Sequence, residues 1–384
     1  MRRGDNRGER RLRVARVVPE LDYGGVETAV ATQALVGHAP DIELEVVVFH
    51  RAGAVAERVR AAGVPVHVLG VAPAIRSPGA TLALARLLRR MRVDVVHAAI
   101  AEANLHAVVA SRLAGVRGVV TEEVGTPRRS ARARALMGLV HRGATRTIAC
   151  SQATATYLAA QERVPRERID VVYNSWGTGA LPRSSSDGPQ GTQLLMVGRL
   201  VPEKDHATVI HAFAQLVQED GAGGAALAIA GAGPLEPELR ALVRRLGMVD
   251  RVRLLGYCSD VPELLRTAGV VLMPSTNEGY GIALVEAMAA GVPVISSTAG
   301  GLREVTAGYP SEWLLPPGDV PAWREAIRRF LRLDNAQRDA LGVRARGIAL
   351  ERFSPEAYVA ALERVYRAVA AGSPHAATLL KSSR

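Results

Sequence analysis

The sequence contains few cysteines and no long apolar run. Two cysteines, Cys150 and Cys258, cannot form a disulfide framework, and this fits a reducing cytoplasm. No run of about 18 apolar residues occurs, so the sequence predicts no membrane-spanning helix. The start MRRGDNRGERRLRV lacks the apolar core of a signal peptide, and we expect residues 1–10 to form a disordered basic tail. The sequence therefore predicts a cytoplasmic protein.

Aromatic residues are also scarce, at 4% of the chain, which leaves few platforms on which nucleic-acid bases could stack. The net charge of +11 is placed unevenly. Residues 1–186 carry 27 arginines against 16 acidic residues, whereas the rest of the chain carries 21 basic and 21 acidic residues. A basic half favours an anionic partner, such as a phosphate group or a membrane surface. Nucleic acid is not expected.

Short β-rich runs alternate with helical stretches along most of the chain. Continuous apolar strands separated by helices are typical of parallel sheets built from βαβ units. The polar stretch LPRSSSDGPQG at 181–191 interrupts the alternation and reads as a linker. We therefore expect two doubly wound α/β domains, residues 11–180 and 192–353, followed by closing helices. The strands are expected at 13–18, 43–50, 65–70, 94–98, 118–121, 146–150, 170–174, 193–198, 226–231, 251–256, 270–274 and 293–297.

Each half begins with a strand and a loop suited to bind an anion. In the first half Gly24 and Gly25 open a helix, and glycines there let a phosphate approach the helix N-terminus, although glycine also marks ordinary turns. In the second half Arg199 directly follows a strand, and Lys204 begins the next helix. Lysine is otherwise found only at position 381, beside 46 arginines. A lysine at this position therefore indicates a compact ammonium for phosphate, although a surface pair is the alternative.

The segment EGYGIALVE, residues 278–286, runs from Glu278 into an apolar helix that holds a second carboxylate, Glu286. Gly279 and Gly281 leave backbone N–H groups free to meet an anion. Glu278 and Glu286 lie eight residues apart, which is about 12 Å if helical. They could flank that anion and accept hydrogen bonds from sugar hydroxyls, as acidic residues do in dinucleotide sites. A nucleotide-sugar fits this layout, and a structural role for Glu286 is the alternative.

Four segments together resemble the retaining glycosyltransferases of family 4, which have the GT-B fold. They are GGVE at 24–27, GRLVPEK at 198–204, AGAGP at 230–234 and EGYGIALVE at 278–286. AGAGP alone reads as a tight turn. The resemblance implies two Rossmann-like domains facing a cleft, with acceptor binding in the first and nucleotide-sugar binding in the second. It also implies that the helix within residues 354–384 crosses back to the first domain.

The resemblance also implies roles for single residues. Arg199 and Lys204 would bind the donor diphosphate and stabilise the leaving group, while Glu278 would contact the donor sugar and Glu286 the ribose. The amides of Gly279, Tyr280, Gly281 and Ile282 would meet phosphate, and Gly24 and Gly25 would approach from the other domain. Relatives of this kind work without a metal or other cofactor, and the sequence has no Asp-x-Asp motif for Mg²⁺ or Mn²⁺.

The acceptor side is less defined. Many relatives carry a histidine after the strand at 118–121, where this chain has Glu122 and Glu123. His97, Glu102 and Asn104 follow another strand and are expected to face the same crevice, although a histidine at a strand end is often structural. The segment 127–146 carries Arg128 and other arginines before several apolar residues. It is either a solvated helix or a surface for an anionic membrane, and an anionic or lipid-linked acceptor would also explain its charge.

The sequence thus predicts a cytoplasmic, metal-independent, retaining transferase of a hexose-type sugar to a hydroxyl acceptor, with peripheral membrane contact left open. A UDP-sugar is the first choice of donor and GDP-mannose the second, because nothing in the sequence names the base. A GT-B epimerase or phosphorylase is an alternative, as is a non-catalytic anion-binding protein on the same scaffold. An epimerase would turn over its nucleotide-sugar without an acceptor.

Overall fold

A computed structural model describes residues 11–22, 24–177 and 193–372. The expected basic tail, the expected linker and residues 373–384 lie outside these ranges. The described residues form two units. The first unit contains the chain up to residue 177 together with the segment from Pro355, and the second contains the residues between, up to Ser354.

The first unit is built on a seven-stranded sheet in the order β3-β2-β1-β4-β5-β6-β7, with all paired strands parallel. Runs of valine and isoleucine favour the extended backbone of these strands. The strands are β1 (Leu12–Val18), β2 (Ile42–Val48), β3 (Val66–Val68), β4 (Val95–Ala99), β5 (Gly118–Glu123), β6 (Arg146–Ala149) and β7 (Ile169–Val171).

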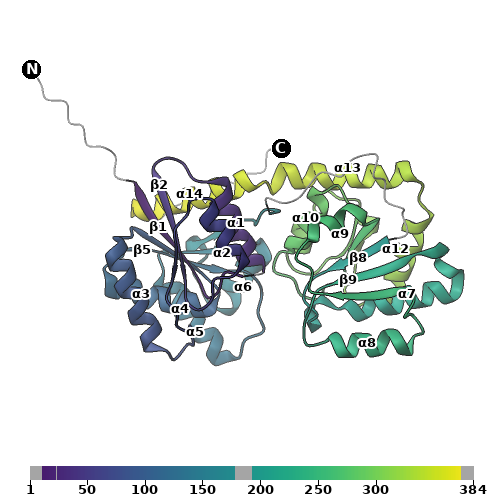
Figure 1. Cartoon of the computed structure of the whole chain (residues 1–384), viewed down its shortest axis with the longest axis horizontal. Coiled ribbons are helices and arrows are strands. Elements are labelled where there is room, and N and C mark those ends of the chain that lie inside the picture. Colours follow the sequence, from purple (N-terminus) through teal and green to yellow (C-terminus); the bar gives the residue numbers. More distant parts are fainter. Residues whose placement is uncertain (1–10, 23, 178–192, 373–384) are drawn as a thin grey trace, which may run out of the picture. The chain divides into compact units, whose positions relative to one another are not determined.

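Helices cover both faces of this first sheet. Its helices are α1 (Gly25–Val36), α2 (Ala54–Ala61), α3 (Pro78–Met91), α4 (Ala101–Ala114), α5 (Ala131–Gly143), α6 (Gln152–Gln161) and α14 (Pro355–Ala370). Figure 1 shows α3, α4 and α5 on one side of the sheet and α1 and α14 on the other. Leu84 and Leu88 of α3 pack on one face, and Leu362 and Tyr366 of α14 pack on the opposite face. The last helix of the chain is therefore part of the core of the first unit.

The second unit has a six-stranded sheet in the order β10-β9-β8-β11-β12-β13, again with all pairs parallel. Its strands are β8 (Gln193–Val197), β9 (Ala226–Ala230), β10 (Val252–Gly256), β11 (Val270–Met273), β12 (Val294–Ser297) and β13 (Leu314–Leu315). Its helices are α7 (His206–Asp220), α8 (Glu236–Arg245), α9 (Val261–Thr267), α10 (Ile282–Ala289), α11 (Leu302–Val305), α12 (Val320–Arg332) and α13 (Asn335–Arg352).

The predicted fold class is confirmed, since each predicted strand appears within a few residues of its expected position. One observed strand, β13, was not predicted, and it consists of only Leu314 and Leu315. Among the described helices, none is long and apolar enough to cross a membrane.

Candidate functional site

The predicted anion-binding residues of the second unit gather where its strand order reverses. From β8 the chain proceeds to β9 on one side, while β11 lies on the other side of β8. In open α/β sheets this switch point leaves a crevice at the carboxyl ends of the strands, where ligands bind. Arg199 and Lys204 follow β8, and Glu278 follows β11. The topology alone therefore brings these loops side by side.

A direct ion pair joins the two loops. The Lys204 ammonium donates to Oε2 of Glu278, and Ser275 Oγ donates to the same oxygen over 3.3 Å. The side chains of Lys204 and Glu278 are 18% and 15% exposed, so both remain accessible to a ligand. Thr276 N also donates to the carbonyl of Glu203 over 2.8 Å. Main-chain and side-chain contacts thus hold Lys204 and Glu278 next to each other.

Glycines allow the loops of this edge to pack closely. A Cβ on Gly231 would lie 1.8 Å from the carbonyl oxygen of Gly198. Any larger residue at position 231 would therefore push apart the loops that follow β8 and β9. A Cβ on Gly300 would lie 2.2 Å from the carbonyl oxygen of Glu278, and one on Gly301 would lie 2.2 Å from that of Gly279. The position of Glu278 therefore depends on close backbone packing against the loop after β12.

The helix α10 begins after Gly281, which has a φ of +93° and places the helix N-terminus at this edge. Most of α10 is buried, but Ile282, Ala283 and Glu286 are partly exposed, and Glu286 shares a helix face with the other two because it lies three and four positions after them. No hydrogen bond or ion pair within the described chain reaches the Glu286 carboxylate. Although part of the side chain is accessible, burial raises the pKa of Glu286 to about 7.

The remaining predicted donor residues occupy different environments. Arg199 is exposed and makes no ion pair with any described residue, so its guanidinium is available to a ligand. The Tyr280 ring is buried and meets Phe353 edge to face at 5.8 Å between ring centroids. The Tyr280 ring is therefore part of the core of the second unit.

In the first unit, Gly24 and Gly25 lie at the N-terminus of α1, as predicted. Gly24 has a φ of +149°, and a Cβ there would lie 2.4 Å from Oε2 of Glu27. Burial, followed by the nearby Glu20 and Asp22, raises the pKa of Glu27. Carboxylates thus surround this loop, a feature that the glycine pattern did not reveal.

His97 is fully buried, which corrects our expectation that it faces the crevice. Arg16 of β1 contacts its ring and also pairs with Glu122, and Tyr366 of α14 bonds to His97 Nδ1 over 2.8 Å. Burial, followed by the charge of Arg16, lowers the pKa of His97 to about 4. Burial favours a higher pKa for Glu122, but the charge of Arg16 and the hydrogen bonds from His97 and Arg16 together outweigh it and hold that pKa at about 2. The arrangement anchors α14 to the sheet.

The other predicted acceptor residues divide between structural and accessible positions. Asn104 is buried and forms two hydrogen bonds with the main chain of Glu122. Asn104 Nδ2 donates to the Glu122 carbonyl over 2.9 Å, and the Glu122 N–H donates to Asn104 Oδ1 over 3.3 Å. Asn104 therefore also has a structural role. Glu102 is partly exposed, and Arg128 is exposed. Neither forms an ion pair with a described residue.

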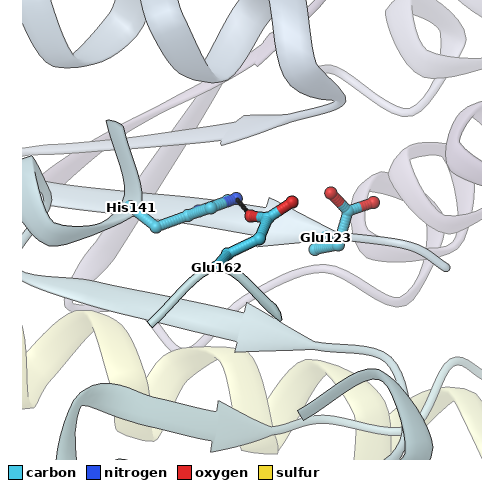
Figure 2. A group of neighbouring side chains, drawn as sticks. All are labelled: Glu123, His141 and Glu162. Carbon is cyan, nitrogen blue, oxygen red and sulfur yellow. Dashed lines mark ion pairs between the residues drawn. The ribbon is translucent and has the colours of Figure 1, made fainter. Parts of the chain in front are cut away.

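Glu123 lies at the end of β5 in a buried cluster with His141 of α5 and Glu162, which follows α6 (Figure 2). Arg129 bridges the two carboxylates, 2.8 Å from Oε2 of Glu123 and 2.5 Å from Oε1 of Glu162. Burial raises the pKa of Glu123 to about 7 despite Arg129. Burial, followed by the charge of Arg129, lowers the pKa of His141 to about 3. The predicted acceptor residue Glu123 therefore holds the loop between β5 and α5.

This cluster is also the group of described side chains that could hold a metal ion, since one ligand atom of each residue lies within 4.8 Å of the others. Arg129 already supplies the positive charge that a cation would bring to the carboxylates. We therefore interpret the cluster as a buried ion-pair network. Sequence reasoning missed Arg129, His141 and Glu162 because only tertiary packing brings them together.

Two protein-family models match the chain. A model of the family described as Glycosyltransferase Family 4 matches residues 23–175, and one described as Glycosyl transferases group 1 matches residues 182–348. The chain belongs to glycosyltransferase family 4. The predicted family is therefore confirmed, and the two matches together span both units.

Solved structures agree with this fold. HepE from Anabaena, in complex with UDP and glucose, superposes with a TM-score of 0.80 at 22% identity, over 93% of this chain and 99% of that one. Sucrose-phosphate synthase from Thermosynechococcus elongatus gives a TM-score of 0.73 at 19% identity, over 94% of this chain and 100% of that one. Identities this low show the GT-B fold alone.

Curated relatives are more similar over shorter stretches. The N-acetyl-alpha-D-glucosaminyl L-malate synthase of Bacillus anthracis is 35% identical over 158 residues, 41% of this chain and 40% of that protein. A D-inositol 3-phosphate glycosyltransferase of Salinispora arenicola is 34% identical over 204 residues, 50% of this chain and 45% of that protein. The chain thus matches half or less of the length of these relatives.

Proposed function

We propose that this family 4 glycosyltransferase moves a hexose-type sugar from a nucleoside diphosphate to an acceptor hydroxyl, with retention of the anomeric configuration. The observation that carries the proposal is the accessible Lys204–Glu278 ion pair at the switch point of the second sheet. Arg199 and Glu286 follow the same two strands, and both lack a charged partner among the described residues.

The ion pair suggests how a donor would bind. Diphosphate oxygens would accept hydrogen bonds from Lys204, replacing the Glu278 carboxylate, and Arg199 would fork across two further oxygens. Glu278, released from the ammonium, would then accept hydrogen bonds from hydroxyls of the donor sugar. Glu286 would accept from the ribose, whose hydroxyls would satisfy a carboxylate that now has no partner. The N-terminus of α10 adds backbone N–H groups for phosphate at Gly279 to Ile282.

We further propose that the reaction needs no metal. The leaving nucleoside diphosphate develops negative charge, and two fixed cations at its binding site would stabilise that charge as a metal ion does elsewhere. Lys204 and Arg199 would supply these two charges. Chelation of divalent cations should therefore leave turnover unchanged.

UDP is our first choice of donor nucleotide and GDP the second. HepE of Anabaena, which shares the fold, has been solved with UDP and with UDP-glucose. That likeness supports a uridine donor for this chain.

We propose that the acceptor is an anionic molecule, free or lipid-linked, bound by the basic first unit. Gly24 and Gly25, at the start of α1, would approach the donor diphosphate from this unit. Two curated relatives are named for L-malate and inositol 3-phosphate, which are both anions. Glu102 and Arg128 are the predicted acceptor residues that remain accessible. The low cysteine content, Cys150 and Cys258 alone, fits a cytoplasmic setting.

Proton NMR of donor turnover tests the activity. We expect UDP-glucose to release α-glucose first when water is the only acceptor, both with and without EDTA. Release of β-glucose first would contradict retention, and loss of turnover in EDTA would contradict metal independence. Conversion to another nucleotide-sugar, with no free sugar, would favour the epimerase alternative.

A further inference from the structure

We propose that the outer surface of α3, α4 and α5 docks the protein on an anionic lipid surface. We name this surface the α3–α5 face. It belongs to the first unit alone, and it does not depend on the donor chemistry proposed above.

The three helices form one continuous layer on one side of the first sheet (Figure 1). Arg89 of α3 donates to the carbonyl of Leu113 at the end of α4 over 2.5 Å, which ties these helices together. Val108 of α4 packs with Met137 and Val140 of α5. The layer therefore presents a single outer surface.

Large apolar side chains remain exposed on this surface although the inner faces of the helices already fill the core. Leu139 is 63% exposed, and four others are between 37% and 49% exposed. These four are Leu82 of α3, Val109 and Leu113 of α4, and Leu136 of α5. Single exposed apolar residues are ordinary, but every helix of this layer carries at least one.

The charge of the layer has one sign. The three helices carry seven arginines and a single acidic residue, Glu102, at the start of α4. Among the described residues, none of these seven arginines pairs with a carboxylate. Arginines on α12 behave differently, because Arg328 pairs with Glu219, Asp220 and Glu325. The α3–α5 face therefore lacks the anions that balance a comparable arginine-rich helix elsewhere in the chain.

Arginines without a carboxylate partner, interleaved with aliphatic side chains, fit a bilayer surface. Lipid headgroups supply the missing anions, and the leucines can enter the boundary below them. Arginine stems can lie along that boundary while their guanidinium groups stay at the phosphates. Each basic residue near an anionic surface strengthens binding about fivefold. The face has no aromatic side chain on which bases could stack, so a lipid surface is favoured over nucleic acid.

Vesicle flotation tests the proposal with the full chain. We expect binding to vesicles of phosphatidylcholine with phosphatidylglycerol, little binding to phosphatidylcholine alone, and weaker binding in high salt. Leu136→Asp with Leu139→Asp should reduce binding about tenfold or more, and Arg86→Glu with Arg132→Glu should do the same. The matched controls are Val343→Asp with Leu350→Asp and Arg244→Glu with Arg329→Glu, at exposed positions of the second unit.

Circular dichroism melting of each variant separates lost docking from lost folding. The proposal is overturned if wild type does not bind the anionic vesicles, or if the control pairs reduce binding as much as the face pairs do. Binding to a DNA or RNA oligomer that the face variants abolish, without vesicle binding, would assign the face to nucleic acid instead.

Discussion

At the scale of single residues, Glu122 and Glu286 differ in whether a counter-charge offsets the cost of burial. Glu122 is paired with Arg16, and its pKa is held at about 2. Glu286 has no partner within the described chain, and its pKa is raised to about 7. A buried carboxylate that no described residue pairs with, on a helix that begins at the same sheet edge as Lys204, is a functional candidate.

Replacing Glu286 by glutamine should stabilise the ligand-free protein. The pKa of Glu286 in the folded protein lies above its ordinary value, so proton binding by Glu286 adds to the free energy of unfolding. This contribution is complete below pH 4.5 and is lost as the pH rises through 7. We expect Glu286→Gln to raise the free energy of unfolding by about 1–3 kcal/mol at pH 8 and to change it little near pH 4.5. Urea titrations at both pH values measure this, with the exposed Glu312→Gln as control. Destabilisation at pH 8 would mean that Glu286 has a structural role.

Arg129 and Arg128 are neighbours with opposite expected effects. Arg129→Met leaves Glu123 and Glu162 buried without a counter-charge, which should cost about 3–5 kcal/mol at pH 8. The loss should shrink at pH 5, where burial lets the Glu123 carboxyl group take up a proton. Arg128→Met, at an exposed position, should change stability by less than about 0.5 kcal/mol. Equal losses in chemical denaturation would show that the bridge does not hold this loop.

At the scale of elements, the strands were predictable because buried parallel strands are short apolar runs. The placement of Lys204 and Glu278 on neighbouring loops was predictable too, because both follow strands. The environment of His97 was not predictable, since it depends on Tyr366, which is distant in sequence and lies on α14. The α10 helix looked buried on all faces, but its Ile282, Ala283 and Glu286 are partly exposed at the carboxyl edge.

The close packing of the loops after β11 and β12 should control donor affinity. Gly301 has an ordinary helical φ of −68°, so alanine there is excluded by the main chain of Gly279 and Tyr280 and not by its own backbone conformation. We expect Gly301→Ala to weaken UDP binding about tenfold by displacing the loop that carries Glu278. Gly347→Ala, inside α13 with open space around it, should leave UDP binding unchanged and stabilise the helix by about 0.5–1 kcal/mol. Titration calorimetry compares the two, and unchanged affinity in both would contradict this account.

At the scale of the whole molecule, the two units differ in charge. The basic excess lies in the first half of the chain, while the second half is balanced and carries the residues we assign to the donor. The sequence showed this division through its arginine distribution. It could not show which arginines are paired, because Arg129 and Arg128 differ only in their tertiary surroundings.

The most direct measurement of the central claim is thermal stabilisation by UDP, GDP, ADP and TDP, with wild type beside Lys204→Ala and Glu286→Ala. A nucleotide at a hundredfold excess over its Kd should add about 2.7 kcal/mol of stability. We predict that UDP raises the melting temperature of wild type and that both variants lose this gain while remaining folded. Stabilisation that survives in both variants would contradict the assignment of the donor site, and no stabilisation of wild type by any of the four would contradict the donor itself.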